Sequence, residues 1–338
     1  MGSAGHPAVT PDRIRQLAWG YAAPLMIAAA LRHRVFDLLD GGPKTVEEVA
    51  AANGASVRGL RAIMNALTSL QLLTKDGDSR YGLAADTATF LVAGKPGYLG
   101  GLIRHNSTES LARWMELDEV VRTGKPAQPV NKEKTGAEFF HSFVEDIFPA
   151  SYPAAQALAG ALDVAGAEQP QRVLDLGAGS GVWGIALAQK SPKVTVTAVD
   201  WPGVLDVTRR MAARFGLEDR FLFVPGGLLE ADFGRGHHVA VLGHILHSVG
   251  EKDSRALLRR VFDALAPGGT IAIAEFLVDD ERATSPGLIF AVNMLVATEE
   301  GDTYSFREIA GWLREAGFEE ARTLDAPGPS PLILATRP

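Results

Sequence analysis

Residues 173–187 read VLDLGAGSGVWGIAL, an apolar run followed by glycines at 177, 179 and 181 and then by a second apolar run. The first run has the length and composition of a buried strand, and the second continues for the length of a helix. Glycines between them let the backbone turn tightly and let a ligand approach without interference from Cβ atoms. The stretch therefore predicts a strand, a ligand-binding loop formed by Gly177, Gly179 and Gly181, and a helix.

Apolar, strand-like segments alternate with amphipathic helical stretches from residue 171 onward. The segments are RVLDLG, VTVTAVD, FLFVPG, VAVLGHI, TIAIAEFLV, ARTLDA and LILATR. This alternation predicts an α/β fold with a parallel, doubly wound sheet. Ligands of such sheets bind at the carboxyl ends of the strands, so we expect the functional site at that edge.

Two ligands fit the glycine loop. With Gly184 as its third glycine and Asp200 about 20 residues further on as the ribose partner, it fits a dinucleotide such as NAD. With Asp175 at its entrance, it fits S-adenosylmethionine, whose sulfonium and ammonium groups are cationic. A carboxylate disfavours a pyrophosphate and stabilises a nearby cation. The electrostatics therefore favour S-adenosylmethionine, with Asp175 and the loop glycines as cofactor-binding residues.

Asp200 ends the next strand-like segment and is followed by Trp201. A carboxylate at that edge can accept hydrogen bonds from both ribose hydroxyls, and an indole can lie on the face of the adenine. The alternative is a solvated aspartate beside a surface tryptophan. Because a glycine loop precedes them at the expected spacing, we predict that both residues bind the cofactor.

Two histidines, His244 and His247, follow the strand that ends near Gly243. A histidine can be neutral at pH 7 and remove a proton from a hydroxyl that attacks a methyl group. Glu275 closes the next strand and reaches the same edge of the sheet, where its carboxylate could hold one imidazole nitrogen and leave the other free. We predict that His247 is the base and Glu275 its partner, the alternative being a histidine that caps or packs in the loop. Gly243 is assigned to the cofactor loop, and His244 to the pocket or the cofactor loop.

The N-terminal part of the chain predicts a small helical module with the outline of a winged helix. The stretch 11–39 is apolar over more than half of its helical circumference, so we expect it to be covered on most sides. A helix capped by Thr45, a helix that starts at Ser56 and a hairpin around residues 76–78 follow. The second of these helices offers only two arginines to a DNA groove, so a packing and dimerisation module is the better interpretation.

Composition limits the classes of function. The chain has 338 residues, 46% hydrophobic content, a net charge of −7 and no cysteine. It therefore forms no disulfide and no thiolate metal site, and its charge argues against nucleic acid as a partner. It has no apolar run of the ~18 residues that span a membrane, and no signal-peptide core, so we expect a cytoplasmic protein. The acidic clusters at 279–281 and 299–302 indicate solvated loops, and we expect no metal.

From about Asp12 onward, the sequence resembles the S-adenosylmethionine-dependent O-methyltransferases with an N-terminal winged-helix dimerisation domain, a group that includes plant phenolic and bacterial natural-product enzymes. The resemblance rests on RWMELDEVVRTGKP, LDLGAGSG, VD followed by an aromatic residue, HILHS, ALAPGGTIAIAEFLV and NMLVATEEGDTYSFREIAGWLREAGF. It implies that His247 is the general base and that Glu275 orients it. It also implies homodimers whose N-terminal helices intertwine and help to wall the partner's substrate pocket.

The chain departs from this family at three places. The family's His-Asp-Trp is replaced by His247-Ser248-Val249, and its second catalytic acid by Thr303. The aspartate that usually faces adenine is replaced by Gly227, so we expect the cofactor to be bound there by backbone and by Leu228.

The resemblance further implies an acceptor pocket lined by aromatic and methionine side chains, which suit a flat, moderately apolar acceptor. Phe290, Asn293 and Met294 lie near one face of a helix, although Phe290 and Met294 could equally be core. The remaining pocket residues come from bridging helices and are Trp114, Phe139, Phe143 and Phe148.

These observations predict three parts: a dimerisation domain at 1–95, bridging helices at 96–168 and a cofactor-binding catalytic domain at 169–338. The predicted function is transfer of a methyl group to a hydroxyl of a small aromatic or polyketide-like metabolite. Two alternatives remain open. One is a C- or N-methyltransferase or a non-methylating enzyme on the same scaffold, and the other is a winged-helix regulator that senses a small molecule.

Overall fold

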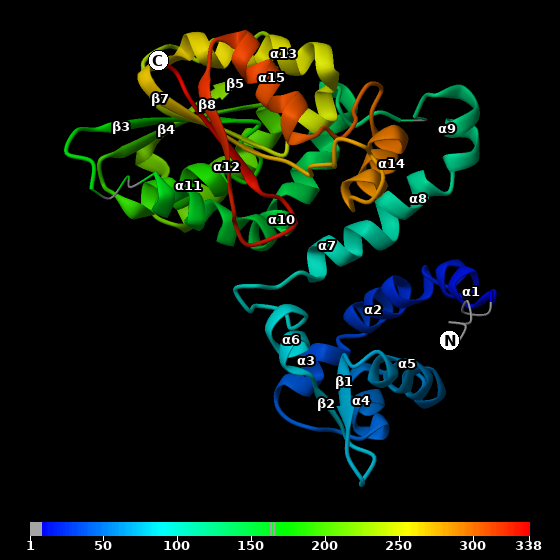
Figure 1. The fold of residues 1–338 in the computed structure, drawn as a ribbon. Coiled ribbons are helices and arrows are strands. Elements are labelled where there is room, and N and C mark those ends of the chain that lie inside the picture. The colour runs from blue at the N-terminus through cyan, green and yellow to red at the C-terminus, as the bar shows by residue number, and fades with distance from the viewer. Residues whose placement is uncertain (1–8, 127, 163, 165) are drawn as a thin grey trace, which may run out of the picture. The chain divides into compact units, whose positions relative to one another are not determined.

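The computed structural model describes residues 9–338 except 127, 163 and 165 (Figure 1). The residues before position 9, which the expectation of no signal peptide concerns, lie outside the described part. The chain divides into two compact units, Met1–Glu109 and Ser110–Pro338. No helix among the described residues is long and apolar enough to cross a membrane.

The N-terminal unit consists of short helices and one hairpin. Its elements are α1 (Asp12–Ala18), α2 (Ala22–Arg32), α3 (Val35–Asp40), α4 (Val46–Asn53), α5 (Val57–Ser69), β1 (Leu73–Lys75), β2 (Tyr81–Leu83), α6 (Ala85–Phe90) and α7 (Gly100–His105). Thr45 and Ser56 cap α4 and α5 as predicted, and Thr45 forms a reciprocal capping box with Glu48. The two strands pair antiparallel around the predicted turn.

The first apolar stretch is three helices instead of one. Residues 19–21 separate α1 from α2, and Arg34, in a left-handed conformation with φ of +54°, separates α2 from α3. The prediction that this stretch is covered on most sides is wrong for the single chain. Leu17 and Trp19 are 67% and 69% exposed. An apolar surface of this kind marks an interaction site for another chain.

A seven-stranded sheet forms the centre of the second unit. Its strands are β3 (Gln171–Leu176), β4 (Val194–Asp200), β5 (Phe221–Pro225), β6 (His237–Gly243), β7 (Leu265–Ala274), β8 (Glu319–Leu324) and β9 (Leu332–Thr336), in the order β5-β4-β3-β6-β7-β9-β8. All seven predicted strands are present. The expectation of a parallel sheet needs one correction, because β9 lies between β7 and β8 and runs antiparallel to both.

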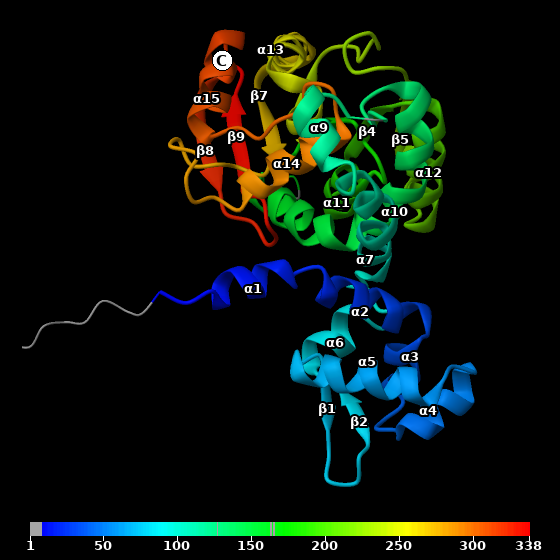
Figure 2. The ribbon, with the colours of Figure 1, turned by 90° about the vertical axis from the view of Figure 1, so that its right-hand side faces the viewer.

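Helices cover both faces of this sheet (Figures 1 and 2). The helices are α10 (Glu133–Ala161), α11 (Val182–Lys190) and α12 (Pro202–Arg214) on one face, and α13 (Leu246–Ala264) and α15 (Phe306–Ala316) on the other. Alternate strand residues supply the two cores. Val173 packs in the core with α10 to α12, while its neighbour Leu174 packs in the core with α13 and α15. This arrangement leaves the carboxyl edge of the parallel strands for the loops.

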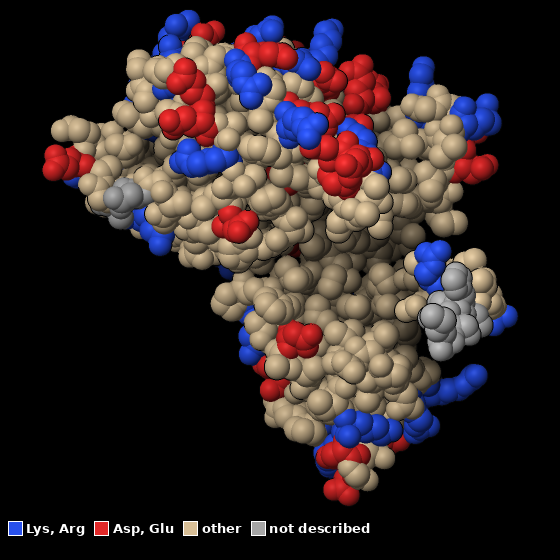
Figure 3. Space-filling model, in the orientation of Figure 1, with Lys and Arg blue, Asp and Glu red and all other residues tan. Residues whose placement is uncertain are grey.

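The remaining elements of this unit are short. They are η1 (Asn106–Ser110, at the boundary between the units), α8 (Leu111–Trp114), α9 (Leu117–Thr123), η2 (Glu218–Arg220) and α14 (Gly287–Ala297). Helix α14 contacts α8, α9 and α13. On the face that carries α13 and α15, Lys and Arg alternate with Asp and Glu, so the described residues there form no continuous basic surface (Figure 3).

Candidate active site

The glycine loop between β3 and α11 depends on its glycines. Gly177, Gly179 and Gly181 have φ values of +62°, +56° and +73°, in the left-handed region that favours glycine. A Cβ atom on Gly177 would lie 2.2 Å from Cδ1 of Ile245. The loop therefore presents bare backbone at the carboxyl end of β3, as the sequence predicts.

Asp175 lies beneath this loop and is fully buried. Its Oδ2 accepts a hydrogen bond of 2.9 Å from the backbone N–H of Gly184, while Oδ1 has no partner among the described residues. Burial raises the pKa of Asp175 from 3.8 to about 7, opposed by the Gly184 hydrogen bond and assisted by the charge of Asp200. A buried carboxylate with an unpaired oxygen favours a cation nearby, so this position fits a sulfonium-bearing cofactor.

Asp200, at the end of β4, fixes the glycine loop from the side. Its Oδ2 accepts from the N–H of Gly179 at 2.9 Å, and Oδ1 accepts from the N–H of Trp201 at 2.8 Å. Burial raises the pKa of Asp200 to about 6, although both N–H groups act to lower it. Each oxygen keeps a further lone pair, which is the requirement for holding ribose hydroxyls. The ring of Trp201 packs towards α10, with its centroid 6.2 Å from that of Phe140.

Leu228 follows β5 and reaches the glycine loop. Its Cδ1 lies 3.9 Å from the position that a Cβ atom of Gly177 would take. Gly227 precedes it and its carbonyl accepts hydrogen bonds from the N–H groups of Glu230 and Ala231. Asp200 is thus hydrogen-bonded to the glycine loop, while Asp175, at the end of β3, and the side chain of Leu228 lie beside the loop at the same edge of the sheet.

His247 and Glu275 form a buried pair, 8% and 2% exposed. Nδ1 of His247 lies 2.7 Å from Oε2 of Glu275, and the backbone N–H of His247 donates to Oε1 at 3.2 Å. Burial alone would raise the pKa of Glu275, but the charge of His247 and the hydrogen bonds from it outweigh burial and lower the pKa. An ionised Glu275 accepts a hydrogen bond from Nδ1–H of His247, so Nε2 is the ring nitrogen left to take a proton.

Aromatic rings surround this pair. The ring of Phe290 stands perpendicular to that of His247 with centroids 5.0 Å apart, and the centroids of Phe276 and Phe290 are 4.0 Å apart. Phe276 was not among the predicted residues, although its place directly after Glu275, at the same edge, is a usable signal. A ring in edge-to-face contact restricts the orientation of the imidazole.

His244, for which the sequence left the pocket and the cofactor loop open, contacts this aromatic group. Its Nε2 lies 2.9 Å from Oγ of Ser330, and its ring centroid is 5.1 Å from that of Phe276. Burial lowers the pKa of His244 to about 4, although the charge of Glu275 acts to raise it, so this imidazole is neutral at pH 7. Ser330 comes from the connection before β9, and no local sequence signal points to it.

Gly243 has a packing reason to be glycine. A Cβ atom there would lie 1.9 Å from Nε1 of Trp183, a buried residue of α11. The close approach of the indole therefore accounts for this glycine without any ligand.

The predicted acceptor residues fall into two groups. The first group lies on α8 and α14, where Nε1 of Trp114 donates to Oδ1 of Asn293 at 3.0 Å. Phe290 and the buried Met294 belong to the same helix, α14. The second group lies on α10, where Phe139 packs against Phe143 with ring centroids 5.4 Å apart.

Phe148 lies apart from these two groups. It is buried and stacks on Tyr152 and Phe215, with centroids 5.2 Å and 5.4 Å away. Its ring therefore fills the core between α10 and the end of α12, which is a correction to its predicted place in the acceptor pocket.

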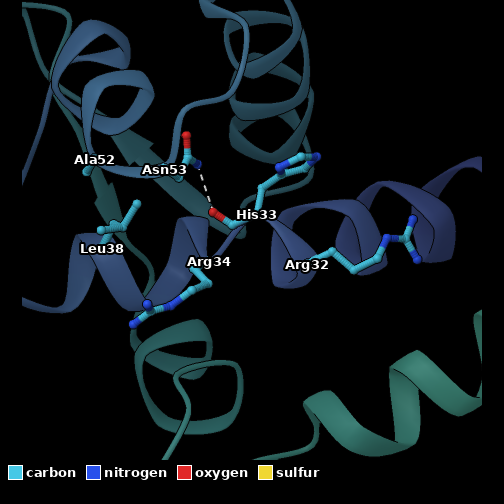
Figure 4. A pocket seen from close by; sticks show the side chains of 6 residues that line it. All are labelled: Arg32, His33, Arg34, Leu38, Ala52 and Asn53. Atoms are coloured by element: carbon cyan, nitrogen blue, oxygen red, sulfur yellow. Dashed lines mark hydrogen bonds between the residues drawn. The ribbon is translucent and has the colours of Figure 1, made fainter.

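Two other features carry no predicted site residue. In the N-terminal unit, a hollow of about 260 Å³ is lined by Arg32, His33, Arg34, Leu38, Ala52 and Asn53 (Figure 4). In the second unit, the carboxylate of Asp279 accepts hydrogen bonds from the N–H groups of residues 283–285. These hydrogen bonds lower the pKa of Asp279 to about 2 and show that this acidic residue stabilises its own loop. No cluster of three or more histidine or acidic side chains is placed to hold a metal ion among the residues that the structure describes.

Comparison with known proteins identifies a dimerisation domain and an O-methyltransferase domain, the two domain types that the sequence predicts. A family model described as O-methyltransferase dimerisation domain matches residues 15–93, and one described as O-methyltransferase domain matches residues 114–319. The chain is 32% identical over 335 residues to 3-hydroxy-5-methyl-1-naphthoate 3-O-methyltransferase of Streptomyces sahachiroi, covering 97% of this chain and 95% of the relative.

A second relative is the tetracenomycin polyketide synthesis 8-O-methyltransferase TcmO of Streptomyces glaucescens, with 29% identity and 97% coverage of each chain. The crystal structure of human N-acetylserotonin methyltransferase in complex with S-adenosylmethionine shares the fold, with a TM-score of 0.85, 24% identity and coverage of 100% of this chain and 99% of that chain. The chain therefore belongs to the S-adenosylmethionine-dependent O-methyltransferases that carry an N-terminal dimerisation domain.

Proposed function

We propose that this enzyme methylates a hydroxyl group of a small aromatic metabolite with His247 as general base. The observation that carries the proposal is the buried contact between Nδ1 of His247 and Glu275, 2.7 Å long. Nε2 of His247 has no hydrogen-bond partner among the described residues. A base oriented in this way and enclosed by aromatic rings is suited to a hydroxyl on a flat acceptor.

The protein's part in the reaction is to hold a proton acceptor and to align two ligands. The cofactor, when bound, supplies a methyl group already activated on a sulfonium. Glu275 keeps the proton on Nδ1, so Nε2 of His247 removes the proton of the acceptor hydroxyl as its oxygen attacks. Glu275 then stabilises the imidazolium that forms. Alignment of the attacking oxygen with the methyl carbon supplies most of the rate enhancement.

We assign the cofactor to the loops around β3 and β4. Asp200 accepts the ribose hydroxyls, Trp201 and Leu228 enclose the adenine, and the buried charge of Asp175 favours the cationic end. Gly177, Gly179, Gly181 and Gly227 allow close approach of the ligand. The Asp175 oxygen without a partner and the φ values of the glycine loop support this assignment. None of the proposed steps requires a metal.

We assign the acceptor to the side chains around Phe290 and Asn293. The two Streptomyces relatives are named for a hydroxynaphthoate and for a polyketide, so we propose a fused-ring phenolic acceptor for this chain. Residues 1–95 serve as the dimerisation domain of a homodimer, 96–168 as bridging helices and 169–338 as the catalytic domain. The exposed apolar side chains of α1 and the match to a dimerisation domain support the homodimer.

Calorimetric titration tests the cofactor assignment, with S-adenosylmethionine and NAD each titrated into the wild-type protein and into Asp200→Ala. We expect micromolar binding of S-adenosylmethionine alone, abolished in the variant. Binding of NAD alone would refute the assignment.

A panel of hydroxynaphthoates and matched O-methyl ethers, assayed by mass spectrometry, tests the reaction itself. We expect mono-O-methylation that is lost in His247→Ala. Methylation of a carbon or nitrogen, or activity that does not depend on His247, would instead favour the C- or N-methyltransferase alternative.

A further inference from the structure

The connection from β5 to β6 carries two proposed cofactor residues but offers few side chains to fix it. It contains consecutive glycines, and Gly226 adopts a φ of +144°, which is open to glycine and unfavourable for other residues. Ordering consecutive glycines has a large cost in conformational entropy. With glycine also at 227, this segment presents only backbone and the side chain of Leu228 to a ligand. Beyond the hydrogen bonds within the turn, its position therefore depends on contacts with other elements.

Arg260 of α13 makes such contacts. Its Nη1 donates to the carbonyl oxygen of Leu228 at 3.2 Å, and its Nη2 donates to the carbonyl oxygen of Ala231. The guanidinium also lies over the ring of Phe233, 4.5 Å from the centroid, and Phe233 is buried. A guanidinium holds two acceptors in a rigid planar fork, which a lysine ammonium cannot reproduce. Both ends of the 228–231 turn are thus tied to one side chain.

The opposite side of the same turn faces the glycine loop. Cδ1 of Leu228 lies 3.9 Å from where a Cβ atom of Gly177 would be, and the N–H of Gly226 donates to the carbonyl of Asp200 at 3.0 Å. Leu228 therefore stands between Arg260, which holds its carbonyl, and the glycine loop, which its side chain approaches. Segment α13, which carries Arg260, also carries His247 near its N-terminus, on the other side of a kink at Gly250.

We propose that Arg260 is a positioning residue for the cofactor. It holds Leu228 and the backbone of residues 226–231 in the place where they enclose the adenosine end of S-adenosylmethionine, and it acts through this loop without touching the ligand. The proposal rests on the cofactor assignment of the preceding section. It predicts that loss of the fork loosens the loop and weakens cofactor binding, while transfer from bound cofactor proceeds at its usual rate.

Two variants, Arg260→Ala and Arg260→Lys, test this, with Arg259→Ala as the matched control because Arg259 is the exposed neighbour on the same helix. Hydrogen exchange of residues 226–231 is measured in the ligand-free protein by mass spectrometry, and the Kd of S-adenosylmethionine by calorimetry. We expect faster exchange in this loop and a Kd raised by about tenfold or more in Arg260→Ala. Arg260→Lys should be intermediate, and Arg259→Ala should match the wild type.

With any acceptor that the wild type methylates, KM for S-adenosylmethionine should rise in Arg260→Lys while kcat stays unchanged. Unchanged exchange and affinity in a folded Arg260→Ala would overturn the proposal. If Arg260→Ala does not fold, Arg260→Lys provides the test. Hydrogen exchange and cofactor affinity equal to those of the wild type in Arg260→Lys would then overturn the proposal. A wild-type protein that fails to bind S-adenosylmethionine would refute the proposed function together with this inference, whereas normal binding by both Arg260 variants refutes this inference alone.

Discussion

Glu275 accepts two hydrogen bonds from His247, one from the ring Nδ1 and one from the backbone N–H, so a single carboxylate fixes both the imidazole and the chain that carries it. The backbone hydrogen bond holds the main chain of His247, and the ring hydrogen bond limits the rotational freedom of the imidazole. Phe290, perpendicular to the ring at 5.0 Å, restricts that freedom as well. The imidazole of His247 is therefore held in place before any ligand arrives.

Replacing Glu275 with glutamine should keep the fold but reverse the proton arrangement on His247, because the amide can donate to Nδ1 and leave the proton on Nε2. We expect kcat to fall by about 10²–10⁴-fold, with the Kd of S-adenosylmethionine nearly unchanged. Steady-state assays with calorimetry check both values. Glu281→Gln, on an exposed loop residue, is the control. Wild-type kcat in Glu275→Gln would contradict the assigned role.

Cofactor affinity should depend on pH through Asp200. Its pKa is raised to about 6 by burial, so the carboxylate loses its charge as pH falls below that value. If only the ionised form binds well, the Kd of S-adenosylmethionine should rise by up to about tenfold per pH unit below pH 6. Titrations between pH 5 and pH 8 measure this. Asp200→Asn should bind more weakly at pH 8 and show a shallower pH dependence, whereas an unchanged slope would assign the effect to another group.

The stability of ligand-free Asp175→Asn relative to the wild type should increase as pH rises. Because the folded-state pKa is raised from 3.8 to about 7, the folded protein holds this proton more tightly than the unfolded chain. Stability is therefore lost as pH rises from about 4 through 7. The variant's free energy of unfolding relative to wild type should increase by at most about 3 kcal/mol between pH 5 and pH 8.

Urea unfolding of Asp175→Asn and wild type at the two pH values gives this difference. A constant cost of the new amide cancels in the comparison. If the difference in unfolding free energy between variant and wild type does not change with pH, Asp175 does not hold a proton more tightly in the folded protein. The same variant should bind S-adenosylmethionine more weakly.

The hydrogen bond between Trp114 and Asn293 should matter for the acceptor and not for the cofactor. Trp114→Phe keeps an aromatic ring but removes the donor to Asn293, 3.0 Å away. We expect a higher KM for the acceptor with an unchanged Kd for S-adenosylmethionine. A double-mutant cycle with Asn293→Ala should show a coupling of about 0.5–1.5 kcal/mol in kcat/KM, and strict additivity would show that the two side chains act independently.

A charge on α1 should disrupt the homodimer. Leu17 is 67% exposed in the single chain, so Leu17→Glu leaves the fold of the unit intact while placing a charge in the apolar surface. Light scattering after gel filtration should show a dimer for the wild type and monomer for the variant. The control is Leu222→Glu, at a similarly exposed apolar residue of β5. A dimeric Leu17→Glu would place the interface elsewhere.

Local signals in the sequence were sufficient for most of the architecture. Thr45 and Ser56 mark helix starts through hydrogen bonds to residues three positions on, and the seven strands follow from runs of apolar residues. The glycine loop and the contact between His247 and Glu275 were also predictable, because adjacent parallel strands end at one edge.

Other features depend on contacts that are distant in sequence. The direction of β9 is set by pairing with β7 and β8, which no pattern within residues 332–336 reveals. Phe148 lies on the same helix as Phe143 but meets Phe215 of another segment, so it is core. His244 takes a left-handed backbone conformation with φ of +63°, which turns it towards Ser330. Sequence spacing alone left both the pocket and the cofactor loop open for this residue.

The place of β9 has a consequence for biosynthesis. Strands β7 and β8 are joined only through β9, which follows both of them in chain order. Until the ribosome has released residues 332–336, the growing sheet must keep an open edge at β7, which packs against α13. The nascent catalytic unit therefore completes its central layer late, and β7 is the strand where a chaperone or another unfinished chain would find unpaired backbone groups.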